Sequence, residues 1–353
     1  MADARFALIA QGGAPIEVHV DEARILKIAQ GDQIGQEAKD FRETFVGLIR
    51  CQRCLAVPTV LVASYSDRRP VRYFLFDRAS GRLTGLASSM PWMPEGRPRQ
   101  VATTAARDGL RLPLVVTHPA LPQPGPAPTV LLVHGGPWVR GNHWAWQAEP
   151  QFYASRGYLV LEVDFRGSSG YGSRHYTAGD KQWGLKMQDD LNDAVDHLAA
   201  KGMIDPKRVC ILGASYGGYA AMRAAQRDGG RFRCAISYAG VSDLGRMARY
   251  DSKFLEGAEF KQSLRKKAPD FDAVSPLRFP EQFSTPILLI HGKLDLRVPV
   301  EQSRGMAARL KAAGKTYRYV EQPLGDHHFS RAADRIQFLQ ETDAFLRQYN
   351  PAD

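Results

Sequence analysis

The sequence predicts an α/β protein built on a mostly parallel, doubly wound sheet, with a small, mainly β region before it. From Thr129 onward, short and nearly continuous apolar runs alternate with stretches of helical periodicity. Such runs are typical of strands buried on both faces of a parallel sheet, and the alternation places helices against those faces. With 353 residues, the chain is long enough for one large domain and an appendage.

Each element of this sheet has its own sequence pattern. The expected strands are the apolar runs at residues 129–133, 158–163, 208–212, 233–238, 286–290 and 317–320. Between the second and third runs, Met187, Leu191 and Leu198 recur at helical spacing. Residues 101–117 read as entry strands that turn at Asp108-Gly109. Ligands of open α/β sheets bind at the carboxyl ends of the strands, so the residues after each run are the candidates for function.

A composition shift separates the amino-terminal part. Pro91, Pro94 and Pro98 crowd one segment, and prolines are dense again at residues 119–128, which suits surface connections better than strands or helices. We therefore expect a mainly β region at residues 1–97 and an α/β domain at residues 98–353. Because propeller blades of ~40–50 residues come in sets of four to eight, the first region is too short for a complete propeller.

Charge and cysteine content exclude several classes of protein. The net charge is +10, but Lys and Arg are scattered, so we expect no nucleic-acid partner. The 4 cysteines do not form a disulfide scaffold, with Cys210 and Cys234 inside expected strands. The Cys51-x-x-Cys54 pair lacks partners for zinc, and we expect no metal. The sequence shows neither a leader nor a membrane span, which predicts a cytoplasmic protein without a membrane partner.

The strongest motif is Gly213-Ala214-Ser215-Tyr216-Gly217, a G-x-S-x-G between an expected strand and an expected helix. Glycines permit the tight turn that exposes a nucleophilic serine at such a position. The alternative is an ordinary glycine-rich turn. A serine hydroxyl needs a base, and the base needs a carboxylate to orient it.

Both partners follow in the order found in α/β-hydrolases. Asp295 comes just after the run at 286–290, and His327 follows the run at 317–320. We expect Asp295 to be the orienting carboxylate and His327 the general base. From the residues alone, His328 competes with His327, and Asp326 is an alternative carboxylate.

An oxyanion hole completes this chemistry. We expect one donor to be the backbone N–H of Tyr216 and the other to come from the loop that contains Gly135 and Gly136. A Gly-Gly-Pro turn without a catalytic role is the alternative.

The sequence resembles the catalytic domain of the prolyl oligopeptidase family over about residues 100–350, nearest to acylaminoacyl peptidases and dipeptidyl-peptidase-like enzymes. The motifs that carry the resemblance agree in order and spacing, and they are HGGPW at 134–138, DFRGSSGYG at 164–172, GDKQWG at 179–184, MQDD at 187–190, GASYGGY at 213–219 and HGKLDLRVP at 291–299. The resemblance implies an α/β-hydrolase fold with Ser215 as nucleophile, Asp295 as triad acid and His327 as base. In place of the second glycine of the family's Gly-His-Gly-Phe, this chain has His328.

The resemblance also implies an apolar specificity pocket with Tyr216 at its rim. The lining residues would be Val241, Leu244, Met247, Tyr250 and Val298. Arg297 would hold a substrate carbonyl or carboxylate. Core packing is an equally good interpretation of each apolar side chain.

These observations favour a serine hydrolase that cleaves aminoacyl or acyl-aminoacyl peptide bonds and needs no cofactor. A carboxylesterase with the same triad is the alternative. Family members usually carry a complete propeller that restricts entry to the site, and a site without it would accept esters and bulkier substrates. A non-catalytic interaction module belongs to another class, and the intact triad residues argue against it. Open strand edges in the short β region predict a homo-oligomer.

Overall fold

The computed structural model describes residues 16–18, 48–52, 58–77, 79–80, 82–120, 125–253 and 270–352. The chain divides into two compact units, of which the first contains Met1–Arg99 with Trp144–Gln151 and the second contains Gln100–His143 with Phe152–Asp353. Within the described residues, no helix combines the length and the apolar character that a membrane crossing requires.

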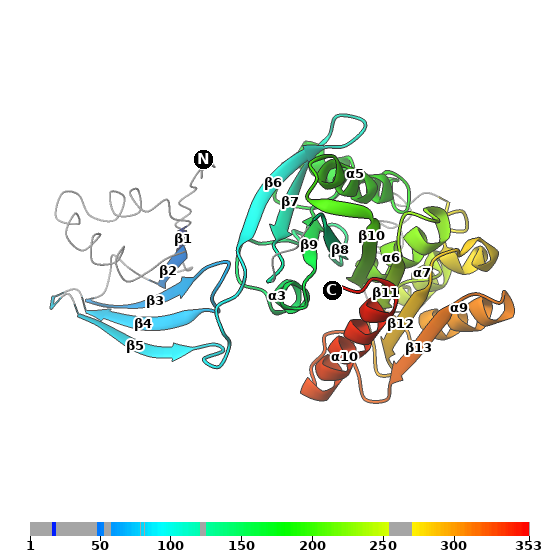
Figure 1. Ribbon diagram of the computed structural model, residues 1–353. Coiled ribbons are helices and arrows are strands. Elements are labelled where there is room, and N and C mark those ends of the chain that lie inside the picture. The colour runs from blue at the N-terminus through cyan, green and yellow to red at the C-terminus, as the bar shows by residue number, and fades with distance from the viewer. Residues whose placement is uncertain are drawn as a thin grey trace. The chain divides into compact units, whose positions relative to one another are not determined.

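The first unit contains a five-stranded antiparallel sheet in the order β1-β2-β3-β4-β5 (Figure 1). Its strands are β1 (Ile16–Val18), β2 (Leu48–Gln52), β3 (Thr59–Tyr65), β4 (Arg72–Asp77) and β5 (Arg82–Ser88). Along β4, buried Phe74 and Phe76 alternate with exposed Tyr73 and Leu75, so one face of the sheet is covered. This sheet confirms the predicted β character of the amino-terminal region.

The segment Trp144–Gln151 is part of the first unit although it follows the start of the α/β sequence pattern. The Trp146 N–H donates to the Ser66 carbonyl at 2.6 Å, and Trp144 Nε1 donates to the Arg99 carbonyl at 2.9 Å. Buried Arg99 donates in turn to the Ala145 carbonyl. These are long-range hydrogen bonds to backbone carbonyls, and the sequence pattern did not predict them.

The second unit is built on an eight-stranded sheet in the order β13-β12-β11-β10-β8-β9-β7-β6 (Figure 1). Its strands are β6 (Arg99–Ala105), β7 (Arg111–Thr117), β8 (Ala127–Val133), β9 (Leu159–Val163), β10 (Ile204–Ala214), β11 (Cys234–Tyr238), β12 (Ile287–Gly292) and β13 (Tyr317–Gln322). The strands from β8 to β13 pair in parallel, and β7 pairs antiparallel with β9. The chain moves from β8 to β9 on one side and to β10 on the other, which confirms the predicted doubly wound sheet.

Helices cover both faces of this sheet (Figure 1). They are α3 (Ala148–Ser155), α4 (Ser173–Thr177), α5 (Lys186–Ala200), α6 (Tyr216–Arg227), α7 (Leu244–Asp251), α9 (Glu301–Ala312) and α10 (Ala332–Tyr349), with short 3-10 turns at Pro276–Arg278 and Pro280–Gln282. In β8, Leu131 packs in the core that includes α5, α6, α7 and α9, whereas Val130 packs in the core that includes Phe338 and Phe345 of α10. The central strands β8, β11 and β12 are largely apolar because each face of the sheet has its own core, whereas the edge strands β6 and β13 are partly exposed.

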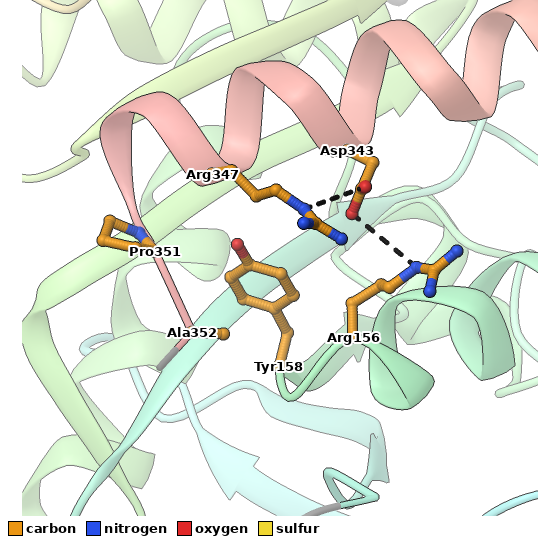
Figure 2. A pocket seen from close by; sticks show the side chains of 6 residues that line it. All are labelled: Arg156, Tyr158, Asp343, Arg347, Pro351 and Ala352. Atoms are coloured by element: carbon orange, nitrogen blue, oxygen red, sulfur yellow. Dashed lines mark ion pairs between the residues drawn. The ribbon is translucent and has the colours of Figure 1, made fainter.

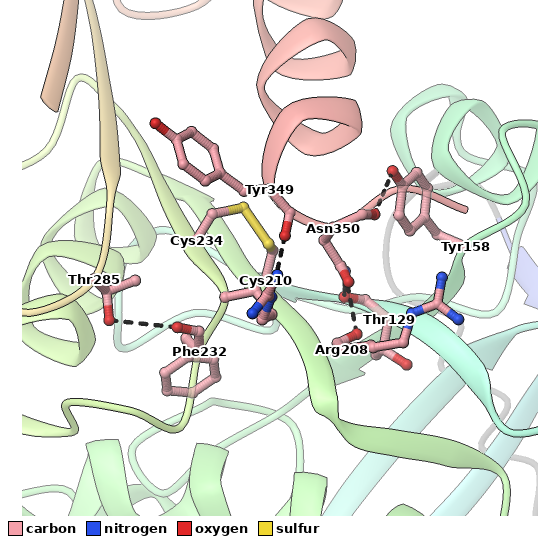
Figure 3. The surroundings of a disulfide bond; sticks show 10 residues. Thr129, Tyr158, Arg208, Cys210, Phe232, Cys234, Thr285, Tyr349 and Asn350 are labelled. Atoms are coloured by element: carbon pink, nitrogen blue, oxygen red, sulfur yellow. Dashed lines mark hydrogen bonds between the residues drawn. A yellow bond between two sulfur atoms is a disulfide. The ribbon is translucent and has the colours of Figure 1, made fainter. Parts of the chain in front are cut away.

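A disulfide joins Cys210 of β10 to Cys234 of β11, a pairing that the sequence analysis did not predict (Figure 3). The two residues are register partners on adjacent parallel strands, with their Cα atoms 4.7 Å apart. Only the strand order brings them together, and the linear sequence does not contain that order. Of the other pair, Cys51 lies in β2, and Cys54 lies outside the described residues.

Candidate active site

Ser215 occupies the sharp turn between β10 and α6. Its φ of 58° and ψ of −118° are unusual for a residue with a side chain, and such strain clusters at functional sites. Two backbone hydrogen bonds hold the turn: the Ser215 N–H donates to the Tyr238 carbonyl at 2.9 Å, and the Tyr219 N–H donates to the Ser215 carbonyl at 3.0 Å. The predicted strand–turn–helix setting of the motif is therefore present.

The glycines of this motif are required by the close approach of β8. A Cβ atom on Gly213 would lie 2.5 Å from the Val133 carbonyl oxygen, and one on Gly217 would lie 2.0 Å from the same atom. The chain leaving β8 consequently passes directly beside the nucleophile, where a Cβ on Gly135 would lie 3.4 Å from the Cβ of Ser215. The glycine pattern thus brings the expected oxyanion loop to Ser215.

The structure brings Asp295 and His327 together from the loops after β12 and β13. His327 Nδ1 lies 2.7 Å from Asp295 Oδ2, and the carboxyl group is buried. The other oxygen, Oδ1, accepts the N–H groups of Arg297 and Val298 at 2.8 Å each. Burial raises the pKa of Asp295, but hydrogen bonds, chiefly from His291 and His327, outweigh it and hold the pKa below its ordinary value. The carboxylate therefore stays ionised.

The alternatives left open by the sequence have other contacts. Asp326 Oδ1 accepts the N–H groups of His328 and Ser330 at 3.0 and 3.1 Å, which closes the turn around His327. His328 is exposed, and its φ is not positive, so the position does not require glycine. The left-handed residue of this loop is Phe329, with a φ of 53°.

His291 is a residue whose contribution the sequence did not reveal. Its ring is fully buried, with Nδ1 2.7 Å from Ser303 Oγ and Nε2 2.9 Å from the Val298 carbonyl. The same Nε2 lies 3.3 Å from Asp295 Oδ2. His291 therefore braces the carboxylate from behind, and its place at the end of an apolar strand was the available signal.

Known proteins are similar to this chain in sequence and in fold. Residues 144–351 match the prolyl oligopeptidase family. This chain belongs to that family. Dipeptidyl aminopeptidase BIII of Pseudoxanthomonas mexicana is 34% identical over 315 residues, which cover 84% of this chain and 45% of that protein. Dipeptidyl peptidase family member 6 of Caenorhabditis elegans is 31% identical over 245 residues, covering 65% of this chain and 32% of that protein.

Solved structures of the prolyl oligopeptidase family have the same fold. A puromycin-hydrolyzing peptidase of Mycobacterium tuberculosis aligns with a TM-score of 0.74 at 27% identity, over 84% of this chain and 46% of that one. The acylaminoacyl peptidase of Pyrococcus horikoshii aligns with a TM-score of 0.73 at 23% identity, over 84% of this chain and 49% of that one. The chain spans less than half the length of each of these relatives.

The loop expected to hold the oxyanion in this prolyl oligopeptidase family member is well anchored. Gly136 has a φ of 115° and precedes a cis peptide bond to Pro137. The His134 ring stacks on Phe165 with centroids 4.4 Å apart, and its Nε2 lies 3.0 Å from Ser168 Oγ. Burial, the largest influence, lowers the pKa of His134, so the ring is neutral. The loop that contains Gly135 and Gly136 is therefore held by the packing of His134 on Phe165 and by its contact with Ser168.

Tyr216 does not lie at the rim of a pocket, and that prediction was wrong for its side chain. The residue is 1% exposed, its hydroxyl donates to Met187 Sδ at 3.2 Å, and its ring packs edge-on against Trp183. As the first residue of α6, it directs its side chain into the core between α5 and α6. The predicted donation by its backbone N–H does not depend on that side chain.

The apolar pocket residues implied by the family resemblance lie close together, but mostly inside the core. Four of them are at most 5% exposed and belong to the core cluster, namely Val241, Leu244, Met247 and Val298. Tyr250 is half-buried, and its hydroxyl donates to the Leu296 carbonyl at 2.8 Å. Arg297 Nη1 lies 2.9 Å from Asp251 Oδ1. A role in substrate binding stays a prediction for all six.

Two cavities among the described residues lie elsewhere, around the C-terminal end of α10. One, of about 370 Å³, is lined by Arg156, Tyr158, Asp343, Arg347, Pro351 and Ala352 (Figure 2). The other, of about 410 Å³, is lined by Lys207, Arg208, Arg233, Tyr349, Asn350 and Pro351. Neither contains a serine, cysteine or histidine, so neither offers an alternative nucleophile–base pair. No group of His, Cys, Asp or Glu suited to a metal ion occurs within the described part of the chain.

Proposed function

We propose that this chain is a serine peptidase that cleaves peptide bonds through an acyl-enzyme on Ser215, with His327 as general base and Asp295 as the orienting carboxylate. The observation that carries the proposal is the 2.7 Å contact between His327 Nδ1 and Asp295 Oδ2 on the sheet edge where Ser215 occupies a strained turn. The names of its relatives, which include aminopeptidases and peptidases, support the same reaction.

Each group has a role in the proposed mechanism. Because Asp295 is ionised and faces Nδ1 of His327, that nitrogen carries the proton and Nε2 is left as the base. Nε2 accepts the Ser215 hydroxyl proton as the oxygen attacks the scissile carbonyl. The resulting oxyanion is held by the Tyr216 N–H and by the loop at Gly135 and Gly136. The imidazolium then protonates the leaving amine, and water hydrolyses the acyl-enzyme by the reverse sequence.

The substrates proposed are small aminoacyl or acyl-aminoacyl peptides. Apolar Val298 belongs to the Asp295 loop, and Val241 and Met247 are members of the same core cluster, which favours an apolar side chain beside the scissile bond. The Arg297 guanidinium, half-exposed and oriented by Asp251, suits a substrate carbonyl or carboxylate. We propose no cofactor or metal, because the triad supplies its own base and the backbone supplies the electrophilic donors.

The first test is labelling with a fluorophosphonate, which reacts with an activated serine. We expect label on Ser215 and none in Ser215→Ala. An unlabelled wild-type protein would sink the proposal and favour the non-catalytic module.

A carboxylesterase is the second candidate. The described residues of the first unit form one five-stranded sheet rather than a set of blades, and an ester would be cleaved by the same triad. Turnover of aminoacyl anilides and of short acyl esters should be compared on the same preparation. Brisk ester cleavage with no anilide cleavage would replace the peptidase by the esterase.

For location and partners, we propose a cytoplasmic protein without a nucleic-acid partner, and a homo-oligomer. β5 ends its sheet, and edge strands pair readily with another chain. Light scattering measures the oligomer, and a monomeric mass would contradict it. Because disulfides rarely persist in cytoplasm, retention of the Cys210–Cys234 bond in protein trapped directly from cells would argue against that location.

A further inference from the structure

Tyr238 lies between the strands that carry the proposed catalytic residues. It is the last residue of β11, and its main chain pairs with Ala214 of β10 and Ile290 of β12. One strand leads directly into Ser215 and the other into the Asp295 loop. The side chain of Tyr238 is 1% exposed, so its conformation is set by packing.

The main chain of Tyr238 holds the nucleophile. Its carbonyl accepts the Ser215 N–H at 2.9 Å. Because Ser215 has a strained backbone, this bond helps to maintain a conformation that would otherwise relax.

The side chain of Tyr238 holds the loop of the general base. Its hydroxyl donates to the Asp326 carbonyl at 2.5 Å. Its ring stacks on Phe329, with centroids 4.0 Å apart and planes 21° apart. Asp326 and Phe329 flank His327, and Phe338 of α10 packs against both aromatic rings at 5.5 and 4.9 Å. The tyrosine therefore clamps the loop on both sides of the imidazole.

We propose that Tyr238 is a positioning residue that fixes the place of His327 relative to Ser215. The inference rests on the proposed function, since it concerns the same serine and histidine. Tyr238 acts through the Asp326 carbonyl and the Phe329 ring rather than on the reacting atoms. A misplacement of about 1 Å in a catalytic group costs on the order of 10²-fold in rate, so a loosened loop is enough to matter.

The phenol remains a donor across the working pH range. Burial raises the pKa of Tyr238, and the nearby carboxylates of Asp295, Asp326 and Asp334 raise it further. Tyr238→Phe consequently removes one hydrogen bond and leaves charge, ring and stacking in place.

The test compares Tyr238→Phe with Tyr158→Phe. Tyr158 is also 1% exposed, and its hydroxyl donates to the Asn350 carbonyl at 2.9 Å at the opposite end of the sheet (Figure 3). Both variants lose a buried bond to a backbone carbonyl, so we expect similar falls in melting temperature. For Tyr238→Phe we also expect kcat to fall about 10- to 100-fold, KM to stay within about twofold, and fluorophosphonate labelling to slow in proportion. For Tyr158→Phe both rates should be unchanged.

The outcomes separate the two proposals. Wild-type kcat and labelling in Tyr238→Phe, or a change in KM alone, would overturn the positioning role and leave Tyr238 a structural residue like Tyr158. Absence of labelling in the wild-type protein would instead overturn the catalytic proposal. If Tyr238→Phe does not fold, Phe329→Leu decides, because it keeps the phenol and removes the stacking. We expect it to lower kcat, and an unchanged kcat would overturn the proposal.

Discussion

The two ends of the central sheet are held together by different means. At the carboxyl ends of the strands, Ser215, Ala239 and Phe329 all have positive φ values, of 58°, 48° and 53°. A buried carboxylate, Asp295, lies among them. At the amino ends, a disulfide joins β10 to β11, and the Asn350 side chain donates to the Arg208 carbonyl at 3.1 Å (Figure 3). Backbone strain and buried charge thus collect at the end proposed to carry the chemistry.

Similar hydrogen bonds at the two ends of the sheet are expected to affect activity and stability differently. Tyr238 and Tyr158 are both buried tyrosines that donate to a backbone carbonyl. One carbonyl belongs to the base loop, and the other follows the last helix. Under our proposal, the first bond positions the loop of His327, and the second contributes only to stability. Variants at the two ends should therefore separate activity from stability.

The largest expected effect is at the nucleophile. Ser215→Ala should reduce kcat on the order of 10⁶-fold, because the residual rate comes only from binding and oxyanion stabilisation. The free energy of unfolding should not fall, since alanine removes only the hydroxyl. Kinetics and denaturant unfolding on one preparation measure both. Retained turnover would remove Ser215 from the mechanism. The carboxyl ends of the strands would then no longer be distinguished from the amino ends by catalysis.

The next effect is at the carboxylate. Asp295→Asn should lower kcat about 10⁴-fold, because the amide no longer holds His327 in the tautomer that leaves Nε2 as base. The neighbouring loops should remain ordered, since the side-chain oxygen can still accept the Val298 N–H. A loss of less than tenfold would indicate that another group orients the imidazole. Asp326→Asn is the matched control and should cost far less.

The disulfide tests the opposite end. Replacing Cys210 and Cys234 together by alanine should lower the free energy of unfolding by about 3 kcal/mol, as expected for a bridge across 24 residues. kcat should change less than twofold, because the bridge links the first residue of β11 to the interior of β10 and does not contact the turn at Ser215. Denaturant unfolding and steady-state kinetics are the measurements. A tenfold fall in kcat would show that the two ends are coupled and would break the comparison.

The central parallel strands were predictable from sequence because their apolar runs are buried on both faces. The strands β8 to β13 all fall on the predicted runs, and Ser215, Asp295 and His327 follow three of them. Long-range pairing was not predictable. The Cys210–Cys234 contact depends on strand order, and Trp144–Gln151 joins the first unit through long-range hydrogen bonds to backbone carbonyls, which have no sequence pattern. The G-x-S-x-G motif predicts the backbone position of Tyr216 but not the direction of its side chain. That direction depends on its place at the start of α6, where the side chain points into the core.

The smallest expected effect concerns a surface ion pair on the last strand of the sheet. Glu321 of β13 accepts from Arg304 at 2.7 and 2.8 Å and from the Tyr319 hydroxyl at 2.6 Å. Hydrogen bonds from Arg304 are the main cause that lowers the pKa of Glu321 from 4.5 to about 2. A lowered folded-state pKa contributes stability that is present above about pH 4.5 and is lost as the pH falls towards 2. Glu321→Gln should therefore lower the free energy of unfolding near neutral pH by less than the disulfide does, and match the wild type near pH 2.

Activity should be unaffected by this substitution, because the pair does not contact the His327–Asp295 bond. Adding Arg304→Gln to Glu321→Gln tests the cause. Without Glu321, the Arg304 guanidinium retains an exposed contact with Glu301 at 3.3 Å, so the second substitution should bring little further pH dependence. An equal stability loss at pH 2 and pH 7 would show that Glu321 acts through packing rather than charge. A fall in kcat would show that a change at Glu321 in β13 displaces the loop that carries His327. The edge strand would then also contribute to the placement of the catalytic residues.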